Sequence, residues 1–200
     1  MLKQVDLFRK LQASLGVALA AIPLSPNQWT MISVLIAFAA AAMIASENLL
    51  PGLLLFAVAA AFDLIDGAVA RARGQVSKLG GFIDGVADRF VEAAFLFSFM
   101  FYPLPWIFLD SDIWLAAVIF LGTCMPSFVR AYADHKEIIA KQKALALGGI
   151  CERSERIGII VLGLAAGIFV SMEFFVYALM LAAFLSAVTV LQRLSAILKG

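Results

Sequence analysis

Long apolar stretches recur along this 200-residue chain, and they constrain its fold more than any other feature. Hydropathy divides the chain into six of them, at residues 28–46, 51–71, 80–102, 113–133, 157–172 and 174–194. Each is close to the roughly 20 residues that an α-helix needs to cross about 30 Å of hydrocarbon. The chain is 64% hydrophobic and only 14% charged, which leaves too few polar residues to cover a water-facing surface. The sequence therefore predicts an all-α integral membrane protein with six transmembrane helices.

The segment before the first span has a different pattern. Residues 1–22 alternate charged residues such as Lys3, Arg9 and Lys10 with an apolar stripe at helical spacing. This pattern predicts an amphipathic helix lying in the membrane interface, with a partner-binding or loosely ordered tail as the alternative. We accordingly divide the chain into a juxtamembrane helix, 1–22, and a six-helix membrane domain, 23–200.

Lysine and arginine gather on alternate connections of this six-span arrangement. All but one of the 15 lie in residues 1–22, in 71–78, in 130–156 and at the C-terminus, whereas the other three connections carry none. The exception is Arg89, which lies inside the third span beside Asp88. Cytoplasmic segments of membrane proteins are enriched in these residues. We therefore expect a multi-pass protein of the cell membrane with both termini and both basic connections in the cytoplasm.

Four aspartates lie at membrane depth in the second and third predicted spans. Asp63 and Asp66 are three residues apart and Asp84 and Asp88 are four apart, so each pair lines one helical face. At 1.5 Å per residue, the deepest of them lie about 12 Å from the cytoplasmic ends of their spans. Two antiparallel helices joined by a short turn would bring both pairs to the same level. The sequence therefore predicts one converging site of four carboxylates.

Such a site needs a cation. A charged side chain at membrane depth costs several kcal/mol unless it is paired, hydrated or metal-bound, and like charges repel one another. Oxygen ligands without His or Cys favour Mg²⁺, Mn²⁺ or Ca²⁺ over zinc. Gly67 and Gly80 leave room for a ligand, and Arg71, close to one turn beyond Asp66, can address a phosphate carried on the metal. Metal, phosphate and lipid depth together indicate a phospholipid headgroup enzyme.

The aspartates also belong to a longer motif. Residues 63–71 read Asp-Leu-Ile-Asp-Gly-Ala-Val-Ala-Arg, and Gly80, Asp84 and Asp88 follow. This motif resembles the complete signature of the CDP-alcohol phosphotransferase family. The six-span layout and the Pro26-Asn27-x-x-Thr30 entry to the first span resemble that family too.

The resemblance implies a reaction and a role for each matched residue. Members displace CMP from a CDP-linked lipid with the hydroxyl of a small alcohol and use a divalent metal, here expected to be Mg²⁺ or Mn²⁺. By resemblance, the metal site comprises Asp63, Asp66 and Asp84, with Asp88 close to the metal and matching the proposed general base. The CDP moiety would be held by Asp63, Asp66, Gly67, Ala70, Arg71 and Gly80. A homodimer is expected on the same ground, and no nucleic acid partner is expected.

The fourth connection bears on the acceptor alcohol. Residues 126–134 and 149–156 are similar to the S-Y-x-K-A-R-A-E and G-x-x-E-R-x-E-R segments of phosphatidylinositol phosphate and archaetidylinositol phosphate synthases. This implies inositol 1-phosphate as acceptor, with its phosphate bound by Arg130, Arg153, Arg193 and Arg156, because guanidinium groups suit a phosphate. The match departs from the pattern at Phe128, Tyr132 and Asp134, where the synthases usually have Tyr, Arg and Glu.

Several alternatives stay open from the sequence alone. Glycerol 3-phosphate, serine or a CDP-inositol donor reaction would use the same core chemistry, and the donor lipid is either CDP-diacylglycerol or CDP-archaeol. A small membrane transporter would also place acids between helices, but the two halves show no inverted repeat. The active site is expected on the cytoplasmic side in every enzymatic reading.

Overall fold

The computed structural model describes Ser14, residues 16–139 and residues 147–199. Across these residues the chain is helical, and its only β-type pairing there is an isolated bridge between Ile107 and Leu109. It divides into two compact units, Met1–Phe95 and Leu96–Gly200. The all-α class is thereby confirmed. The predicted interfacial helix, residues 1–22, lies mostly outside the described residues. Within its described part, residues 16–19 are helical.

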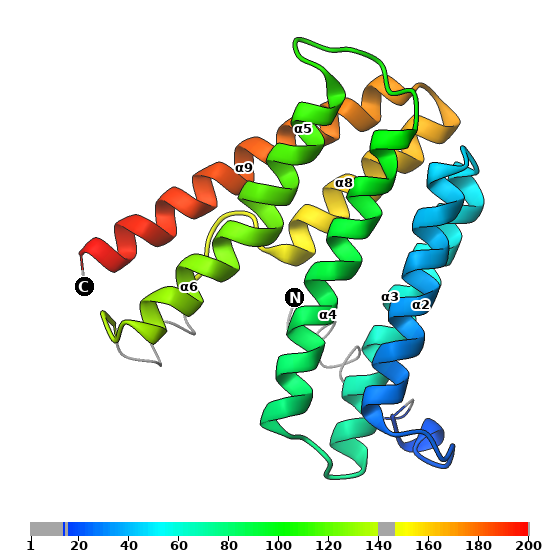
Figure 1. Ribbon diagram of the computed structural model, residues 1–200, viewed down its shortest axis with the longest axis vertical. Coiled ribbons are helices and arrows are strands. Elements are labelled where there is room, and N and C mark those ends of the chain that lie inside the picture. Colours follow the sequence, from blue (N-terminus) through cyan, green and yellow to red (C-terminus); the bar gives the residue numbers. More distant parts are fainter. Residues whose placement is uncertain (1–13, 15, 140–146, 200) are drawn as a thin grey trace. The chain divides into compact units, whose positions relative to one another are not determined.

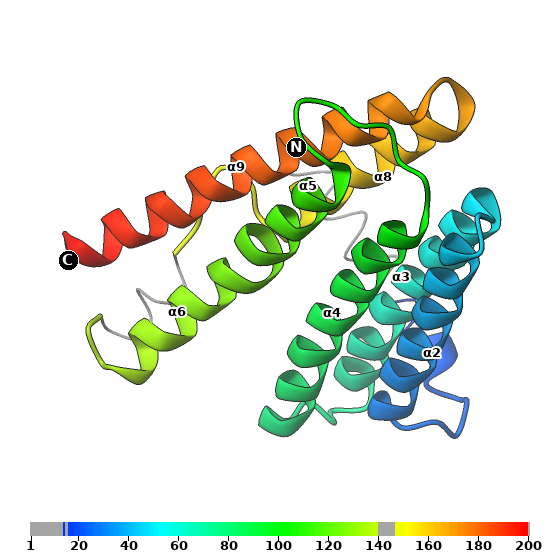
Figure 2. The ribbon, with the colours of Figure 1, turned by 45° about the horizontal axis from the view of Figure 1, so that its top comes forward.

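Helices α2 (Pro26–Ala45), α3 (Leu49–Ala72) and α4 (Lys78–Ser98) lie side by side in the first unit (Figures 1 and 2). Helix α2 and helix α3 form a tight hairpin, in which Ser33 Oγ donates to Ala59 O at 2.9 Å. A Cβ on Gly52 would lie 3.1 Å from Ala40 O, so a glycine lets the two backbones approach closely. The stacked rings of Phe56 and Phe95, 3.8 Å between centroids, pack α3 against α4.

The start of α2 is fixed by a capping box. Ser25 Oγ accepts a hydrogen bond from Gln28 N at 3.3 Å, and Gln28 Oε1 accepts one from Ser25 N at 2.7 Å. Pro26 takes the first helical position, where its missing N–H costs nothing. Two of the four unpaired N–H groups of the helix start are thereby satisfied, and the backbone at Ser25 is held rigidly.

The connection from α3 to α4 is equally well determined. Gly74, with φ of 65°, donates its N–H to Arg71 O, and Gln75 donates to Ala70 O at 2.9 Å. This pair of bonds is a Schellman motif, which ends a helix and favours glycine at the left-handed position. Ser77 Oγ then accepts from Gly80 N at 2.9 Å and begins α4. The short turn predicted between the two aspartate-bearing helices is confirmed.

The second unit contains η1 (Phe99–Phe101), α5 (Ser111–Ala117), η2 (Val118–Cys124), α6 (Met125–His135), α8 (Arg153–Phe169) and α9 (Met172–Leu198). Helix α5, the π-helix η2 and α6 form one continuous run, and Figure 1 shows α9 alongside α8. A Cβ on Gly163 would overlap that of Ala178, so small residues bring α8 and α9 together. Phe99 packs on Phe175 with ring centroids 4.5 Å apart.

Among the described residues, four helical runs are long and apolar enough to cross a membrane: Pro26–Ala45, Leu49–Ala72, Ser111–His135 and Met172–Leu198. They correspond to the first, second, fourth and sixth predicted spans. Helices α4 and α8 occupy the other two positions, but α4 carries four charged residues in its interior and α8 has only 17 residues. Membrane crossing by α4 and α8 therefore stays a prediction.

Candidate active site

Three of the four predicted carboxylates come together between α3 and α4. One carboxylate oxygen from each of Asp63, Asp66 and Asp84 lies within 4.8 Å of the other two. Asp66 is buried, whereas Asp63 and Asp84 are half-buried. The first two lie one turn apart on α3, and Asp84 reaches them from the second turn of α4. Because the donor set is oxygen only, this group can hold a hard divalent cation, which binds such ligands at about 2.0 to 2.6 Å.

Thr30 orients one of these carboxylates from the first turns of α2. Its Oγ1 donates to Asp66 Oδ2 at 2.6 Å in a buried hydrogen bond. The same hydroxyl lies 3.2 Å from Pro26 O, the helix carbonyl one turn before it. A hydrogen bond to one oxygen of a ligating carboxylate fixes how the group presents its remaining lone pairs. Thr30 was not predicted as a site residue, although the Pro26-Asn27-x-x-Thr30 motif was visible in the sequence.

Asp88 lies outside this close group. It follows Asp84 by one turn of α4 and is half-buried, and its Oδ2 is 4.0 Å from Arg89 Nη1. The helix therefore brings Asp88 to the same face as Asp84, as the spacing predicted. Its roles as a metal ligand and as the general base stay predictions.

A pocket of about 360 Å³ adjoins the carboxylates. Five of the six residues predicted to hold the CDP moiety line it, namely Asp66, Gly67, Ala70, Arg71 and Gly80. The sixth, Asp63, is not part of the lining. A Cβ on Gly67 would lie 3.3 Å from Arg71 Nη1, so the glycine leaves the guanidinium room to lie across the helix. The signature therefore forms one wall of a cavity that Asp66 and Asp84, two of the three clustered aspartates, also line.

The opposite wall comes from residues that sequence reasoning missed. Ser25, Pro26 and Asn27 line the pocket from the start of α2, and Gln75, Val76 and Ser77 line it from the α3–α4 connection. Four of the six are polar, and the hydroxyls of Ser25 and Ser77 accept backbone hydrogen bonds at the starts of α2 and α4. Their common signal in the sequence is position, because each set directly precedes a predicted helix that carries site residues.

The arginines predicted to bind the acceptor phosphate lie in the second unit. Arg193, on α9, is only 3% exposed. Its Nη2 donates to both carboxylate oxygens of Glu152, at 2.9 and 2.7 Å, and its Nη1 donates to Pro126 O at 2.6 Å. Pro126 lies one turn before Arg130 on α6, so Arg193 ties α9 to α6 and to the start of α8.

Arg156 is equally buried, at 3% exposure on α8, and depends on a glycine opposite. A Cβ on Gly122 of η2 would lie 2.6 Å from Arg156 Cδ, so only glycine leaves space for this side chain. Arg130 and Arg153 are half-buried, near the middle of α6 and at the start of α8. The second unit thus holds the four predicted arginines on α6, α8 and α9.

Comparison with known proteins adds an independent line of argument. Residues 23–191 match the CDP-alcohol phosphatidyltransferase family. The chain is 37% identical to the archaetidylinositol phosphate synthase of Pyrococcus horikoshii, over 90% of this chain and 86% of that protein. It is 33% identical to the archaetidylinositol phosphate synthase of Methanothermobacter thermautotrophicus, over 86% of this chain and 83% of that protein.

Among solved structures, the fold is similar to that of the phosphatidylinositol phosphate synthase of Mycobacterium tuberculosis. With CDP-DAG bound, that enzyme matches with a TM-score of 0.78 over 94% of each chain, at 22% identity. In complex with manganese and citrate it matches with a TM-score of 0.75, over 94% of this chain and 88% of that chain. At this identity the likeness shows the fold alone, while the family match spans most of both units. The chain therefore belongs to the CDP-alcohol phosphatidyltransferase family and is a multi-pass membrane transferase.

Proposed function

We propose that this protein transfers a phosphatidyl or archaetidyl group from a CDP-lipid to a hydroxyl of inositol 1-phosphate and releases CMP. The observation that carries the proposal is the group of Asp63, Asp66 and Asp84 beside a pocket lined by the family signature. Two relatives that match over more than four fifths of their length are archaetidylinositol phosphate synthases.

The residues of the pocket divide the work. Asp63, Asp66 and Asp84 would hold Mg²⁺ or Mn²⁺, and a bound ion would neutralise the charge of the pyrophosphate and of the leaving CMP. Thr30 keeps Asp66 in its orientation, and Arg71 contacts a phosphate of the donor through its guanidinium. Gly67 and Gly80 let the nucleotide approach the backbone.

Asp88 is proposed to accept the proton of the attacking hydroxyl. Its place one turn beyond Asp84 on the same helix face puts a carboxylate next to the metal group without making it part of that group. A base must lie within hydrogen-bond reach of the proton that it removes, so the proposal requires the acceptor hydroxyl to bind beside Asp88 on α4.

The acceptor phosphate is proposed to bind the arginines of the second unit, Arg130, Arg153, Arg156 and Arg193. A phosphate dianion needs several charge-assisted hydrogen bonds, and guanidinium groups supply them in pairs. Arg193 already donates to Glu152, so its part in binding requires that the phosphate replace or share this carboxylate.

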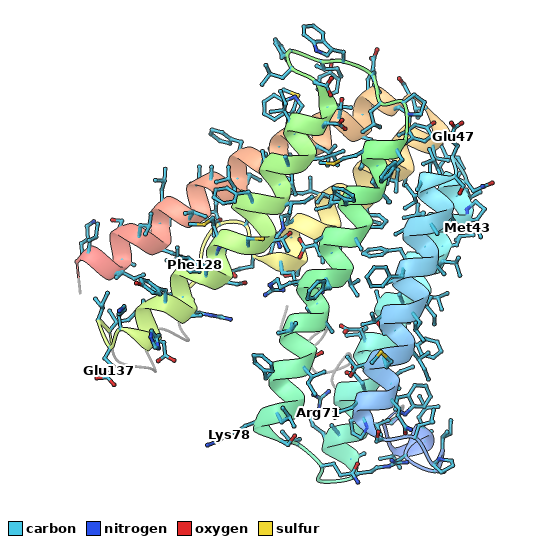
Figure 3. All side chains as sticks on the ribbon, in the orientation of Figure 1. Met43, Glu47, Arg71, Lys78, Phe128 and Glu137 are labelled. Carbon is cyan, nitrogen blue, oxygen red and sulfur yellow. The ribbon has the colours of Figure 1, made fainter. Side chains whose placement is uncertain are left out.

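We further propose six membrane spans, a juxtamembrane helix in 1–22 ahead of the domain at 23–200, a homodimer, and a cytoplasmic active site in the cell membrane. Figure 3 supports the topology within the first unit, with Glu47 at one end and Arg71 and Lys78 at the other.

After replacement of Cys124 and Cys151, an impermeant thiol reagent should label a cysteine near Asp110 from outside and one near Lys136 only after permeabilisation. The reverse pattern would reject this sidedness.

An acceptor panel tests the proposed reaction. Purified protein with Mn²⁺ and either CDP-archaeol or CDP-diacylglycerol is offered inositol 1-phosphate, glycerol 3-phosphate, serine or inositol, and CMP release is measured. We expect the highest kcat/KM with inositol 1-phosphate, and the two donors reveal the preferred lipid. A preference for an uncharged alcohol would contradict the acceptor, while CMP release with any of them would retain the CDP-lipid reaction.

A further inference from the structure

The chain that precedes α2 is held to the first unit by Arg73, a residue outside the family signature. Arg73 Nε and Nη2 donate to Ala20 O at 3.2 and 2.7 Å, and Nη1 donates to Leu24 O at 2.6 Å. Nη2 also donates to Ile22 O. The helical turn at residues 16–19 ends just before these carbonyls. The three carbonyls lie in the turn that follows the helix, and one guanidinium donates to all of them, while Ile22 O also accepts from Leu24 N.

A second contact seats the same segment on α3. A Cβ on Gly16 would lie 2.6 Å from Ala68 O and 3.0 Å from Ala68 Cβ, so any larger residue would push the segment away. Ala68 directly follows Gly67 in the signature. We call the Gly16 contact and the Arg73 hydrogen bonds together the N-terminal dock.

The dock joins the two segments that form the wall opposite the signature, the start of α2 and the α3–α4 connection. Leu24, whose carbonyl Arg73 binds, directly precedes Ser25, which caps α2 and lines the pocket with the next two residues. On the other side, Arg73 directly precedes Gly74 of the Schellman motif and the lining residues that begin at Gln75. Arg73 itself is not part of the lining. Its hydrogen bonds therefore tie these two segments of the lining together, although Arg73 does not line the pocket.

We propose that the N-terminal dock holds the nucleotide pocket in its binding geometry and that Arg73 is a positioning residue for the CDP moiety of the donor. The identity of the nucleotide rests on the proposed function. Neither Gly16 nor Arg73 approaches the pocket directly, so their substitution acts on donor binding through the backbone at Ser25 and Gln75. Residues 16–25 are then part of the enzyme's binding apparatus.

The test measures the affinity for CDP with Mn²⁺ by calorimetry, and the KM of CDP-lipid and of inositol 1-phosphate by CMP release. Arg73→Gln is expected to weaken CDP binding and raise the donor KM by about tenfold, with the acceptor KM unchanged. Arg73→Lys should recover only part of the loss. The ammonium group retains the positive charge, but it lacks the planar set of donors with which Arg73 binds three carbonyls. Gly16→Val should give the same selective loss from a different position.

Matched controls separate the dock from charge and from helix effects. Lys78→Gln removes a positive charge beside the same connection, and Gly158→Ala adds a Cβ to a helical glycine with no atom within 4 Å of that position. Both should keep wild-type CDP affinity. Because Gly16 and Arg73 act on one dock, the double variant should lose little more than the larger single loss.

Wild-type CDP affinity in Arg73→Gln, or equal increases of donor and acceptor KM, would overturn the proposal. Should Arg73→Gln yield no folded protein, Gly16→Ala decides: a selective loss of CDP affinity supports the dock, and unchanged affinity overturns it. Failure of the proposed function is a different result, in which wild-type protein binds CDP but releases no CMP with inositol 1-phosphate. In that case the CDP affinities of the variants still test whether the N-terminal dock holds the pocket in its binding geometry.

Discussion

The two units handle charge in opposite ways. The first brings like charges together, since Asp63, Asp66 and Asp84 approach within 4.8 Å of one another. The second meets a buried charge with its opposite, since Arg193 forms a two-pronged ion pair with Glu152. Converging carboxylates repel one another unless a cation or a proton neutralises them, so this group is suited to hold a metal ion. A paired arginine is already satisfied, so it binds a new anion only by changing partners.

The strongest test of this comparison is Asp66→Asn. The amide removes one negative charge from the group and turns one ligand oxygen into a donor, so CMP release should fall below detection at any Mn²⁺ concentration. Chelation of the wild-type enzyme should have the same effect and be reversed by Mn²⁺ or Mg²⁺. Asp110→Asn is the matched control, because Asn still caps α5 there and activity should persist. An Mn²⁺ titration that shows wild-type rates in Asp66→Asn would remove the metal assignment.

Asp88→Asn separates the fourth acid from the other three. We expect kcat to fall by roughly 10² to 10⁴, the usual contribution of a general base, while CDP binding persists. Single-turnover CMP release and CDP calorimetry on the same sample measure the two effects. A loss of CDP affinity equal to that of Asp66→Asn would assign Asp88 to the metal group, and an unchanged kcat would exclude it as the base.

Thr30→Val tests whether the orientation of the Asp66 carboxylate contributes to metal binding in addition to its charge. Loss of the 2.6 Å hydrogen bond to Asp66 should weaken Mn²⁺ binding by about 10- to 100-fold, as for other groups that orient metal ligands. Thr30→Ser retains the hydroxyl and should stay near wild type. The measurement is the Mn²⁺ concentration that gives half-maximal CMP release, and equal values for the two variants would deny Thr30 this role.

The smallest effects are expected at the ion pair of the second unit. Arg193→Ala should raise the KM of inositol 1-phosphate by about tenfold and leave that of CDP-lipid unchanged, the loss expected for a hydrogen bond to a charged group. Glu152→Gln should lower the acceptor KM by less than about fivefold, since the Glu152 side chain is 41% exposed and exposed pairs are weak.

Glu155→Gln, a neighbouring exposed carboxylate, is the control for Glu152→Gln and should leave the acceptor KM unchanged. A raised acceptor KM in Glu152→Gln would mean that the ion pair holds Arg193 in place for the phosphate. The Glu152 carboxylate would then support acceptor binding. The ion pair of the second unit would in that case serve ligand binding, as the clustered aspartates of the first unit are proposed to do.

The carboxylate group could be predicted because its determinants are local. Spacings of three and four residues fix the helix face, and a short turn fixes the level of two antiparallel helices, so Asp63, Asp66 and Asp84 had to approach. The helical class and the apolar spans follow from composition and hydropathy for the same reason. The predicted helix limits differ from the observed ones by a few residues. The fifth span was predicted to begin at residue 157, whereas α8 begins at Arg153.

The rest depends on partners far away in the sequence. Thr30 and Asp66 are 36 residues apart, and Arg193 and Pro126 are 67 apart, so no periodicity relates them. The sequence shows which polar residues lie in apolar spans, but it does not show which residues they bind. Neither the three carbonyls bound by Arg73 nor the π-helix at Val118–Cys124 leaves a pattern in hydropathy.

That π-helix sets the angular register of everything beyond it. In a regular helix each residue advances the side chains by about 100°, and a π-type turn takes in an additional residue before the regular advance resumes. Helix α6 therefore begins at Met125 rotated relative to α5, and Arg130 points where an uninterrupted helix would have placed its neighbour. The face on which Arg130 lies is thus set by η2, inside an apolar stretch, where a one-residue deletion would rotate Arg130 without altering any charged group.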